Sequence, residues 1–260
     1  MRILFFGDIV GQIGLRALSD VLPSIREKEG ADFVIVNGEN ASDGFGLSKE
    51  DYDFLVSIGA DCITLGNHWN SKREISDYIE DAPHLIRPAN ILHYYLGSGS
   101  KTFEVKGKKI QVTNIMGNAF MKEMVASPIV TLTEILPNAA SIHIVDYHAE
   151  SSSEKALFAA YFDGRVSAVI GTHTHVQTAD ERVSDKGTAF LTDAGLCGAA
   201  NSVIGFDSKS VIDKMVFGTS RHLSINNDAK KAVNGVVLDI DDTGKTTSIR
   251  RINLIDGKEK

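Results

Sequence analysis

Five short polar fragments in this chain each follow an apolar stretch of sequence that is typical of a β-strand. They carry carboxylate, amide and imidazole side chains, a set that suits hard or borderline divalent metal ions without any thiolate ligand. In chain order the fragments are Gly7-Asp8, Asn37-Gly38-Glu39-Asn40, Gly66-Asn67-His68, His148 and Gly171-Thr172-His173-Thr174-His175. The residue types and their repeated position predict a metal site.

The apolar stretches before the fragments predict the strands that must position them. They cover residues 3–6, 33–36, 62–65, 142–145 and 168–170. Strands of one sheet that all end in polar side chains bring them together at its carboxyl edge, where sites form in open α/β sheets. Each fragment alone also has a structural interpretation, such as a helix cap for Asp8. The five together favour a site.

Helical patterns alternate with these strands, which indicates β-α-β units. An apolar stripe from Leu15 to Ile25 recurs at spacings of three and four and predicts a helix packed on a sheet. Ser48 followed by Asp51 resembles a capping box that opens a second helix, which Gly59 ends. The sequence therefore predicts an α/β fold.

The second half of the chain predicts one more helix over residues 154–162 and strands over 188–191, 235–240 and 248–254. Residues 193–217 are rich in Gly, Ala, Asn and Ser and predict a long loop near the site. The sequence contains no repeat and no convincing linker, so we expect a single domain over residues 1–260.

The composition is that of an ordinary globular protein, with 43% hydrophobic and 23% charged residues. The net charge of −7 argues against a general nucleic-acid or membrane surface, because such binding depends on clustered Lys and Arg. No window approaches the roughly 18 apolar residues of a membrane helix. Cys62 and Cys197 favour a reduced, cytoplasmic setting, and a disulfide between them is the alternative.

The constellation resembles the calcineurin-like metallophosphoesterases, and most closely their YmdB-like branch of 2′,3′-cyclic-nucleotide 2′-phosphodiesterases. That branch has an apolar residue in place of the first His of D-x-H, and Glu in place of the bridging Asp. The matching segments are Gly7-Asp8-Ile9-Val10-Gly11, Asn37-Gly38-Glu39-Asn40-Ala41, Gly66-Asn67-His68, Arg87-Pro88-Ala89-Asn90, Val145-Asp146-Tyr147-His148-Ala149-Glu150 and residues 171–178. The resemblance runs from Met1 to about Asp241 and implies a two-sheet β-sandwich flanked by helices.

The resemblance also implies a dinuclear centre in which Glu39 bridges two divalent or mixed-valence ions, Fe or Mn, with Mg as a further candidate. The remaining ligands would be Asp8, Asn40 and His175 for one ion, and Asn67, His148 and His173 for the other. Two dications bring about +4, while two carboxylates and a bridging hydroxide remove about 3. The remaining charge of about +1 would attract a phosphate.

His68 directly follows Asn67, and the resemblance places it beside the ions and not on them. An imidazole titrates near pH 6.5 and can donate a proton to a leaving alkoxide. The resemblance therefore implies that a bridging hydroxide attacks a 2′,3′-cyclic nucleotide while His68 protonates the departing 2′ oxygen, which yields a 3′-nucleotide. A phosphate clamp is the alternative role for His68.

Two segments depart from the family pattern. Trp69-Asn70-Ser71 stands where the family commonly has Thr-Trp-Asp, so either His68 is less firmly oriented or Asn70 takes over the role of the missing acid. Ala199-Ala200-Asn201 replaces a Pro and an acidic residue, which bears on substrate preference or assembly. Asp146 and Glu150 flank His148 and are candidates to fix its tautomer.

The remaining candidates carry weaker signals. Arg87 is a candidate phosphate ligand or a structural ion-pair partner, and Thr172, Thr174 and Gln177 are expected to shape the histidine loop. The histidines without motif context are expected to be structural or on the surface. They are His84, His93, His143 and His222.

Other function classes remain open beside the phosphodiesterase. The ligands alone would serve a phosphomonoesterase, and a weakly catalytic regulatory protein that acts through protein or RNA partners is another alternative. Gly7, Gly11 and Gly14 have the spacing G-x-x-x-G-x-x-G, which does not match a dinucleotide fingerprint. The family resemblance further implies a small phosphoester substrate and a homo-oligomer.

Overall fold

The computed structural model describes residues 1–92, 96–220 and 222–260. In the first half of the chain the elements are β1 (Arg2–Val10), α1 (Gly11–Glu29), β2 (Phe33–Asn40), α2 (Lys49–Ser57), β3 (Cys62–Thr64), α3 (Ile75–Tyr78), η1 (Ile79–Asp81), β4 (Ser100–Val105), β5 (Lys108–Met116), α4 (Pro128–Ile135) and η2 (Leu136–Asn138). The second half has β6 (Ile142–His148), α5 (Ser152–Tyr161), β7 (Ala168–Thr172), β8 (Arg182–Val183), β9 (Ala189–Leu191), β10 (Leu196–Ala199), α6 (Ser208–Met215), β11 (Lys231–Ile240), β12 (Thr246–Ile255) and β13 (Lys258–Glu259).

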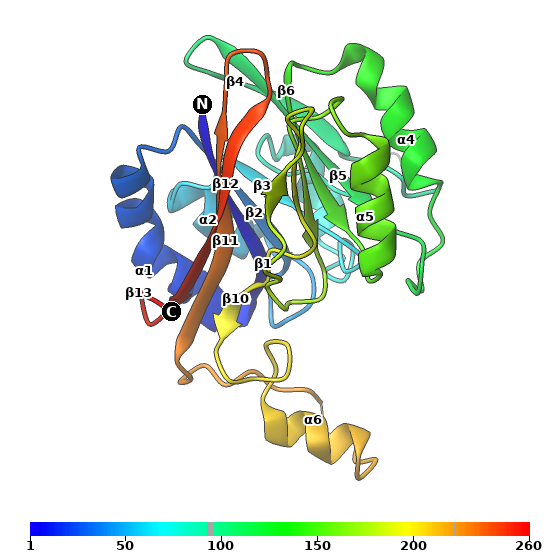
Figure 1. Cartoon of the computed structure of the whole chain (residues 1–260). Helices are drawn as coiled ribbons and strands as arrows, with labels where there is room; N and C mark the ends of the chain where they lie inside the picture. The colour runs from blue at the N-terminus through cyan, green and yellow to red at the C-terminus, as the bar shows by residue number, and fades with distance from the viewer. Residues whose placement is uncertain (93–95, 221) are drawn as a thin grey trace.

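Two β-sheets pack against each other, and helices cover their outer sides (Figure 1). Within the described residues, a seven-stranded sheet has the order β13-β12-β11-β10-β1-β2-β3, and a six-stranded sheet has the order β4-β5-β6-β7-β9-β8. Strand β1 runs parallel to β2 and β10, and β6 runs parallel to β5 and β7. This arrangement confirms the predicted two-sheet sandwich with flanking helices.

Strand β1 is buried on both faces, as the continuous apolar run of a central strand predicts. Ile3 and Phe5 pack into the core between the two sheets, whereas Leu4 and Phe6 pack into the core on the side of α1. This alternation follows from the two-residue period of a strand. The strand register shifts between Phe6 and Asp8, which lies fully buried near the end of the same strand.

The predicted helices and strands are all present, with bounds shifted by up to four residues. In α1 the apolar stripe is buried at Leu15, Leu18 and Leu22. The Ser48 side chain accepts a hydrogen bond from the backbone N–H of Asp51, which confirms the cap that opens α2. No helix of the described residues is long and apolar enough to cross a bilayer.

The prediction of a long loop over residues 193–217 is wrong, because the segment contains β10 and α6. Strand β10 pairs parallel with β1 and antiparallel with β11. Its sequence is too short and too rich in small residues to show an alternating pattern, so tertiary pairing alone defines it. Helix α6 begins after Asp207, whose side chain accepts from the backbone N–H of Ser210, and it projects from the body (Figure 1).

The two cysteines lie on opposite faces of the seven-stranded sheet, so the alternative of a disulfide is wrong. Cys62 lies in the core between the sheets and Cys197 in the core beside α1, and both are free thiols. Burial raises the pKa of Cys197 to about 12 and raises the pKa of Cys62 as well. Both thiols therefore act as small apolar core residues.

Candidate metal centre

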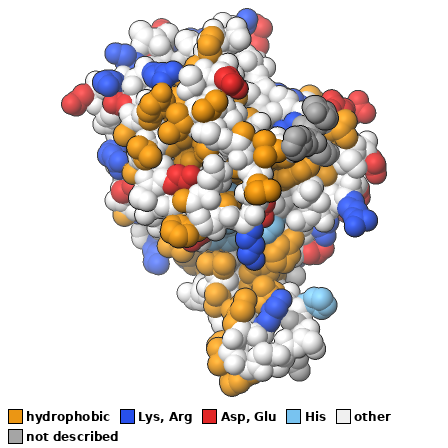
Figure 2. All heavy atoms as spheres, turned by 90° about the vertical axis from the view of Figure 1, so that its right-hand side faces the viewer, with side chains coloured by type: hydrophobic (Ala, Val, Ile, Leu, Met, Phe, Trp, Pro, Cys, Tyr) orange, Lys and Arg blue, Asp and Glu red, His pale blue; other side chains and the backbone are white. Residues whose placement is uncertain are grey.

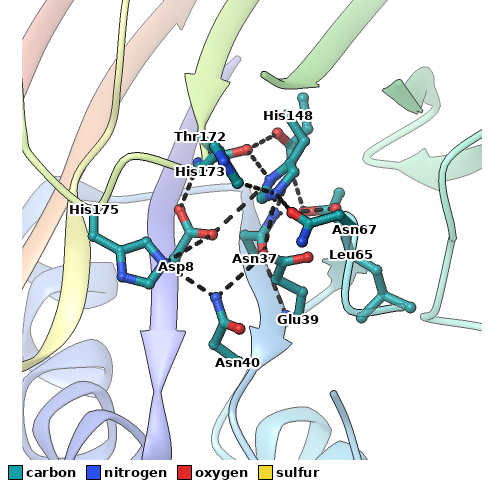
Figure 3. Close-up of polar contacts among 12 residues, drawn as sticks. Asp8, Asn37, Glu39, Asn40, Leu65, Asn67, His148, Thr172, His173 and His175 are labelled. Carbon is teal, nitrogen blue, oxygen red and sulfur yellow. Dashed lines mark hydrogen bonds and ion pairs between the residues drawn. The ribbon is translucent and has the colours of Figure 1, made fainter. Parts of the chain in front are cut away.

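The structure brings the five polar fragments together where the carboxyl ends of both sheets meet (Figure 3). The seven-stranded sheet and its loops contribute four of the predicted ligands, and the six-stranded sheet and its loops contribute three. They are Asp8, Glu39, Asn40 and Asn67 from the first sheet, and His148, His173 and His175 from the second. A site at this position depends on the packing of one sheet against the other.

Three of these side chains form a compact group around His148. Its Nε2 lies 3.1 Å from Glu39 Oε1, 3.0 Å from His173 Nδ1 and 3.0 Å from Asn67 Oδ1. Ligand atoms of Glu39, His148 and His173 all lie within 4.8 Å of one another. One carboxylate oxygen and two imidazole nitrogens at this spacing are a donor set for one divalent cation.

A second group lies on the other side of Glu39. Asn40 Nδ2 is 3.2 Å from Glu39 Oε1 and 3.1 Å from His175 Nε2, and His175 Nε2 is 3.7 Å from Asp8 Oδ1. Asp8 Oδ1 is buried and has no hydrogen-bond partner among the described residues. A buried carboxylate oxygen without a partner is costly, and a bound cation would satisfy it.

The amide of Asn40 is turned with its nitrogen toward this group and its oxygen toward His68. An amide binds a cation through its oxygen, so ligation by Asn40 requires the two atoms to exchange places. The assignment of amide oxygen and nitrogen follows the surrounding hydrogen bonds. A cation near His175 would therefore favour the opposite orientation of the Asn40 amide, with its oxygen toward the cation.

Each of the three histidines has one ring nitrogen held by an oxygen outside the cluster. The contacts are His148 Nδ1 to Thr172 Oγ1 at 2.9 Å, His173 Nε2 to Glu150 Oε2 at 3.2 Å, and His175 Nδ1 to the Ile204 carbonyl at 2.7 Å. A nitrogen that donates to such an oxygen leaves the other nitrogen with a free lone pair. In all three rings that other nitrogen faces the cluster, as in metal-binding histidines.

Thr172 fixes the tautomer of His148 through a chain of hydrogen bonds. Its hydroxyl donates to Asp146 Oδ1 at 2.6 Å and must therefore accept from His148 Nδ1–H. The prediction that Asp146 orients His148 thus holds through Thr172 and not by direct contact. The same prediction for Glu150 is wrong, because Glu150 contacts His173.

The loop after β7 carries two imidazoles in unfavourable backbone conformations. His173 has φ 102° and His175 has φ 64°, values that residues with a Cβ rarely adopt. Such strain persists only where the surroundings hold it in place. Gln177 anchors the end of the loop by donating to the carbonyls of Ala194, Gly235 and Ile252.

A buried ion pair supports the start of this loop. Lys155 of α5 is fully buried, and its Nζ donates to the Thr172 carbonyl and to Asp193 Oδ2, both at 2.8 Å. Asp193 Oδ2 also accepts from the backbone N–H of Thr174 at 3.0 Å. The pair therefore holds the backbone on both sides of His173. This pair was not among the residues predicted from the sequence, although a Lys on the inner face of a predicted helix was its signal.

Positive charge stabilises the buried carboxylates of the cluster in their ionised form. Burial raises the pKa of Asp8 to about 6. Burial also opposes ionisation of Glu39, yet the neighbouring His148 lowers the pKa of this carboxyl below its usual range. Burial likewise opposes protonation of His148, but Glu39 and Asp8 raise its pKa to about 9. A proton on His148 thus supplies charge that a metal ion would replace.

His173 and His68 behave in the opposite way. Burial and the nearby His148 lower the pKa of His173 to about 3, so its ring is neutral and its lone pair is available. Burial also lowers the pKa of His68. The backbone N–H of His68 donates to Glu39 Oε2 at 2.9 Å, and its Nδ1 lies 2.7 Å from Asn40 Oδ1. Asn40, and not the predicted Asn70, therefore orients this ring.

A cavity of about 520 Å³ opens over the cluster. Polar residues of the site line one part of it, and an apolar wall that the sequence analysis missed lines the rest. Arg87 lies outside the cavity and donates to the carbonyls of Pro88, Leu96 and Gly97, which is a structural role. His84 and His143 bind Asp61 O and Thr113 Oγ1, His222 is exposed, and His93 lies outside the described residues.

Comparison with known proteins agrees with this geometry. The profile of the YmdB-like protein family matches residues 4–252. The chain is 41% identical over 260 residues to the 2′,3′-cyclic-nucleotide 2′-phosphodiesterase of Bacillus subtilis, with 98% of each chain covered.

Solved structures confirm the calcineurin-like metallophosphoesterase fold. A phosphatase from Mycoplasma pneumoniae superposes with a TM-score of 0.92 at 36% identity, covering 98% of this chain and 93% of that one. A 5′-nucleotidase precursor from Thermus thermophilus shares the fold with a TM-score of 0.57 at 13% identity, covering 98% of this chain and 54% of that one.

We predict that Lys155→Met lowers the free energy of unfolding by about 3–5 kcal/mol, because it leaves the buried Asp193 carboxylate without its partner. Urea denaturation would measure the loss. Lys49→Met, which removes an exposed pair with Asp53 on α2, is the matched control and should cost at most about 1 kcal/mol. Equal losses in the two variants would show that the buried pair does not support the loop.

Proposed function

Because the chain belongs to the YmdB-like protein family of calcineurin-like metallophosphoesterases, we propose that it opens 2′,3′-cyclic nucleotides to 3′-nucleotides at a dinuclear metal centre. The observation that carries this proposal is the shared orientation of the three histidines. Each ring gives one nitrogen to an oxygen outside the cluster and turns the other toward Asp8 and Glu39.

The donor set fits two cations that share one carboxylate. We assign Glu39 as the bridge because its Oε1 contacts both groups of side chains. The further ligands are Asp8, Asn40 and His175 on one side, and Asn67, His148 and His173 on the other. Carboxylate, amide and imidazole donors accept Fe, Mn or Mg. When bound, the ions would supply an activated water and positive charge for the phosphate oxygens.

The protein's own part in the reaction is to orient the ester and to deliver a proton. His68 lines the cavity beside the cluster, and about a third of its side chain is exposed. When Asn40 binds a cation through its oxygen, its Nδ2–H would donate to His68 Nδ1, so the ring proton would lie on Nε2, the nitrogen left for a substrate. We assign His68 Nε2 as the proton donor to the departing 2′ oxygen.

The first test of this proposal concerns the metal content. Glu39→Gln should reduce bound metal at both positions, because the bridging carboxylate is lost, whereas Asn67→Ala should affect mainly one ion. Elemental analysis after reconstitution with Mn or Fe would count ions per chain, with the exposed Asn70→Ala as control. Wild-type metal content in Glu39→Gln would contradict the bridge, and a wild-type stoichiometry near zero would exclude the dinuclear centre.

The second test isolates His68. His68→Ala should retain its metals but lose on the order of 10²–10⁴-fold in turnover of 2′,3′-cyclic AMP, because a ribose hydroxyl leaves poorly without a proton. The loss on bis-nitrophenyl phosphate should be much smaller, since its leaving group needs no proton. Steady-state kinetics on both substrates, with metal content checked, would measure the difference. Equal losses would instead assign His68 to phosphate positioning, and loss of metal would make it a ligand.

A further inference from the structure

The cavity over the metal cluster has two chemically different ends. Residues of the candidate centre line one end, including Glu39, His68 and His175. The other end is lined by apolar side chains and one glycine, namely Gly44, Phe45, Val203, Ile204, Phe206, Val211, Met215 and Leu223. A volume of about 520 Å³ lies within the range of pockets that hold small molecules.

The turn after β2 presents Phe45 to this cavity. Its neighbours Gly44 and Gly46 have φ values of 86° and 79°, which residues with a Cβ adopt only under strain. A Cβ on Gly44 would lie 3.0 Å from the ring of Phe206, so this close approach also requires glycine. The turn therefore holds a large apolar ring, 39% exposed, at a fixed place beside the centre.

Aromatic rings connect the two ends of the cavity. The Phe45 ring packs edge-on against His68 with centroids 5.0 Å apart, and it stacks on Phe206 with centroids 5.5 Å apart at 30°. Phe206 is buried. The hydrogen bond between His175 Nδ1 and the carbonyl of Ile204, two residues before Phe206, holds this segment beside the cluster. The apolar wall therefore adjoins the centre and continues onto the segment with α6, which projects from the body. Figure 2 shows hydrophobic side chains gathered on this projection.

We propose that the apolar end, with Phe45 as its main contact, binds the nucleobase of the substrate. This inference rests on the function proposed above. A phosphate at the cluster places its leaving oxygen near His68, and the nucleoside beyond it then meets the Phe45 ring. Bases stack on aromatic rings with little dependence on sequence, because every base has a π-face.

The chemistry of this end also predicts how bases are distinguished. Its described lining residues carry apolar side chains or none, so they offer no side-chain group that could read the hydrogen-bonding edge of a base. Stacking area then sets the preference. Purines bind more tightly than pyrimidines, while adenine and guanine bind alike.

The test compares ligands with and without a base. Isothermal calorimetry on the metal-reconstituted protein would measure binding of adenosine 3′-monophosphate and of 1-O-methylribose 3-phosphate. The base should tighten binding on the order of tenfold in the wild type, and Phe45→Ala should remove that gain. Phe54→Ala is the matched control, because Phe54 is also exposed, at 36%, but lies on α2 outside the cavity.

Turnover gives an independent readout. Phe45→Ala should raise KM for 2′,3′-cyclic AMP on the order of tenfold with kcat nearly unchanged, because stacking is made equally in the ground and transition states. The same variant should leave kcat/KM for 1-O-methylribose 2,3-cyclic phosphate at the wild-type value. A similar loss on both substrates would show that Phe45 acts only by packing against His68, and would overturn the proposal.

Three further outcomes separate this inference from its alternatives. Equal binding of the two monophosphates to the wild type would overturn the base subsite even if cyclic AMP is hydrolysed. Base-dependent binding without hydrolysis would instead retain the subsite and refute the proposed reaction. If Phe206→Leu or Phe45→Ala dissociates an oligomer in sedimentation velocity while the preference for the base persists, the wall is an interface between copies and the assignment fails.

Discussion

The buried carboxylates of Asp8 and Glu39 impose the constraint on which the site depends. Both are almost fully buried at the junction of the two sheets, where charge is costly without compensation. In the polypeptide alone the compensation comes from a proton on His148, whose pKa rises to about 9. His173 and His68 do not supply this charge, since burial lowers the pKa of His173 to about 3 and also lowers the pKa of His68. The chain itself therefore supplies only part of the positive charge that would compensate the carboxylates of Asp8 and Glu39.

Hydrogen bonds join the two sheets directly beneath the cluster, where these carboxylates must be held in position. Asn37 of β2 donates to Asp146 Oδ2 of β6 at 3.0 Å, and Thr64 of β3 donates to the same oxygen. The other oxygen of Asp146 accepts from Thr172 and so sets the tautomer of His148. One buried carboxylate thus links the two sheets and also sets which nitrogen of His148 faces the cluster. Because three neighbouring side chains donate to it, we attribute the geometry of the cluster to this network as a unit.

The sequence was sufficient to predict the strands and the polar residues at their ends, because apolar runs and chain order carry that information locally. It could not predict β10, whose pairing depends on two distant strands, or α6, whose short pattern lies among small residues. The contacts that orient the site were equally hidden. Asn40 reaches His68 because β2 pairs with β3, and Glu150 reaches His173 because β6 pairs with β7, so adjacency along the chain suggested the wrong partners.

The loop after β7 shows how stability and function are linked in this fold. Two imidazoles in strained conformations can face the cluster only because the backbone around them is held elsewhere. Lys155 and Asp193 hold the start of the loop, and the Ile204 carbonyl holds the ring of His175 at its far side. Ile204 also belongs to the apolar wall of the cavity. A shift of that wall would alter the direction of His175, so the apolar wall and the cluster form one mechanical unit.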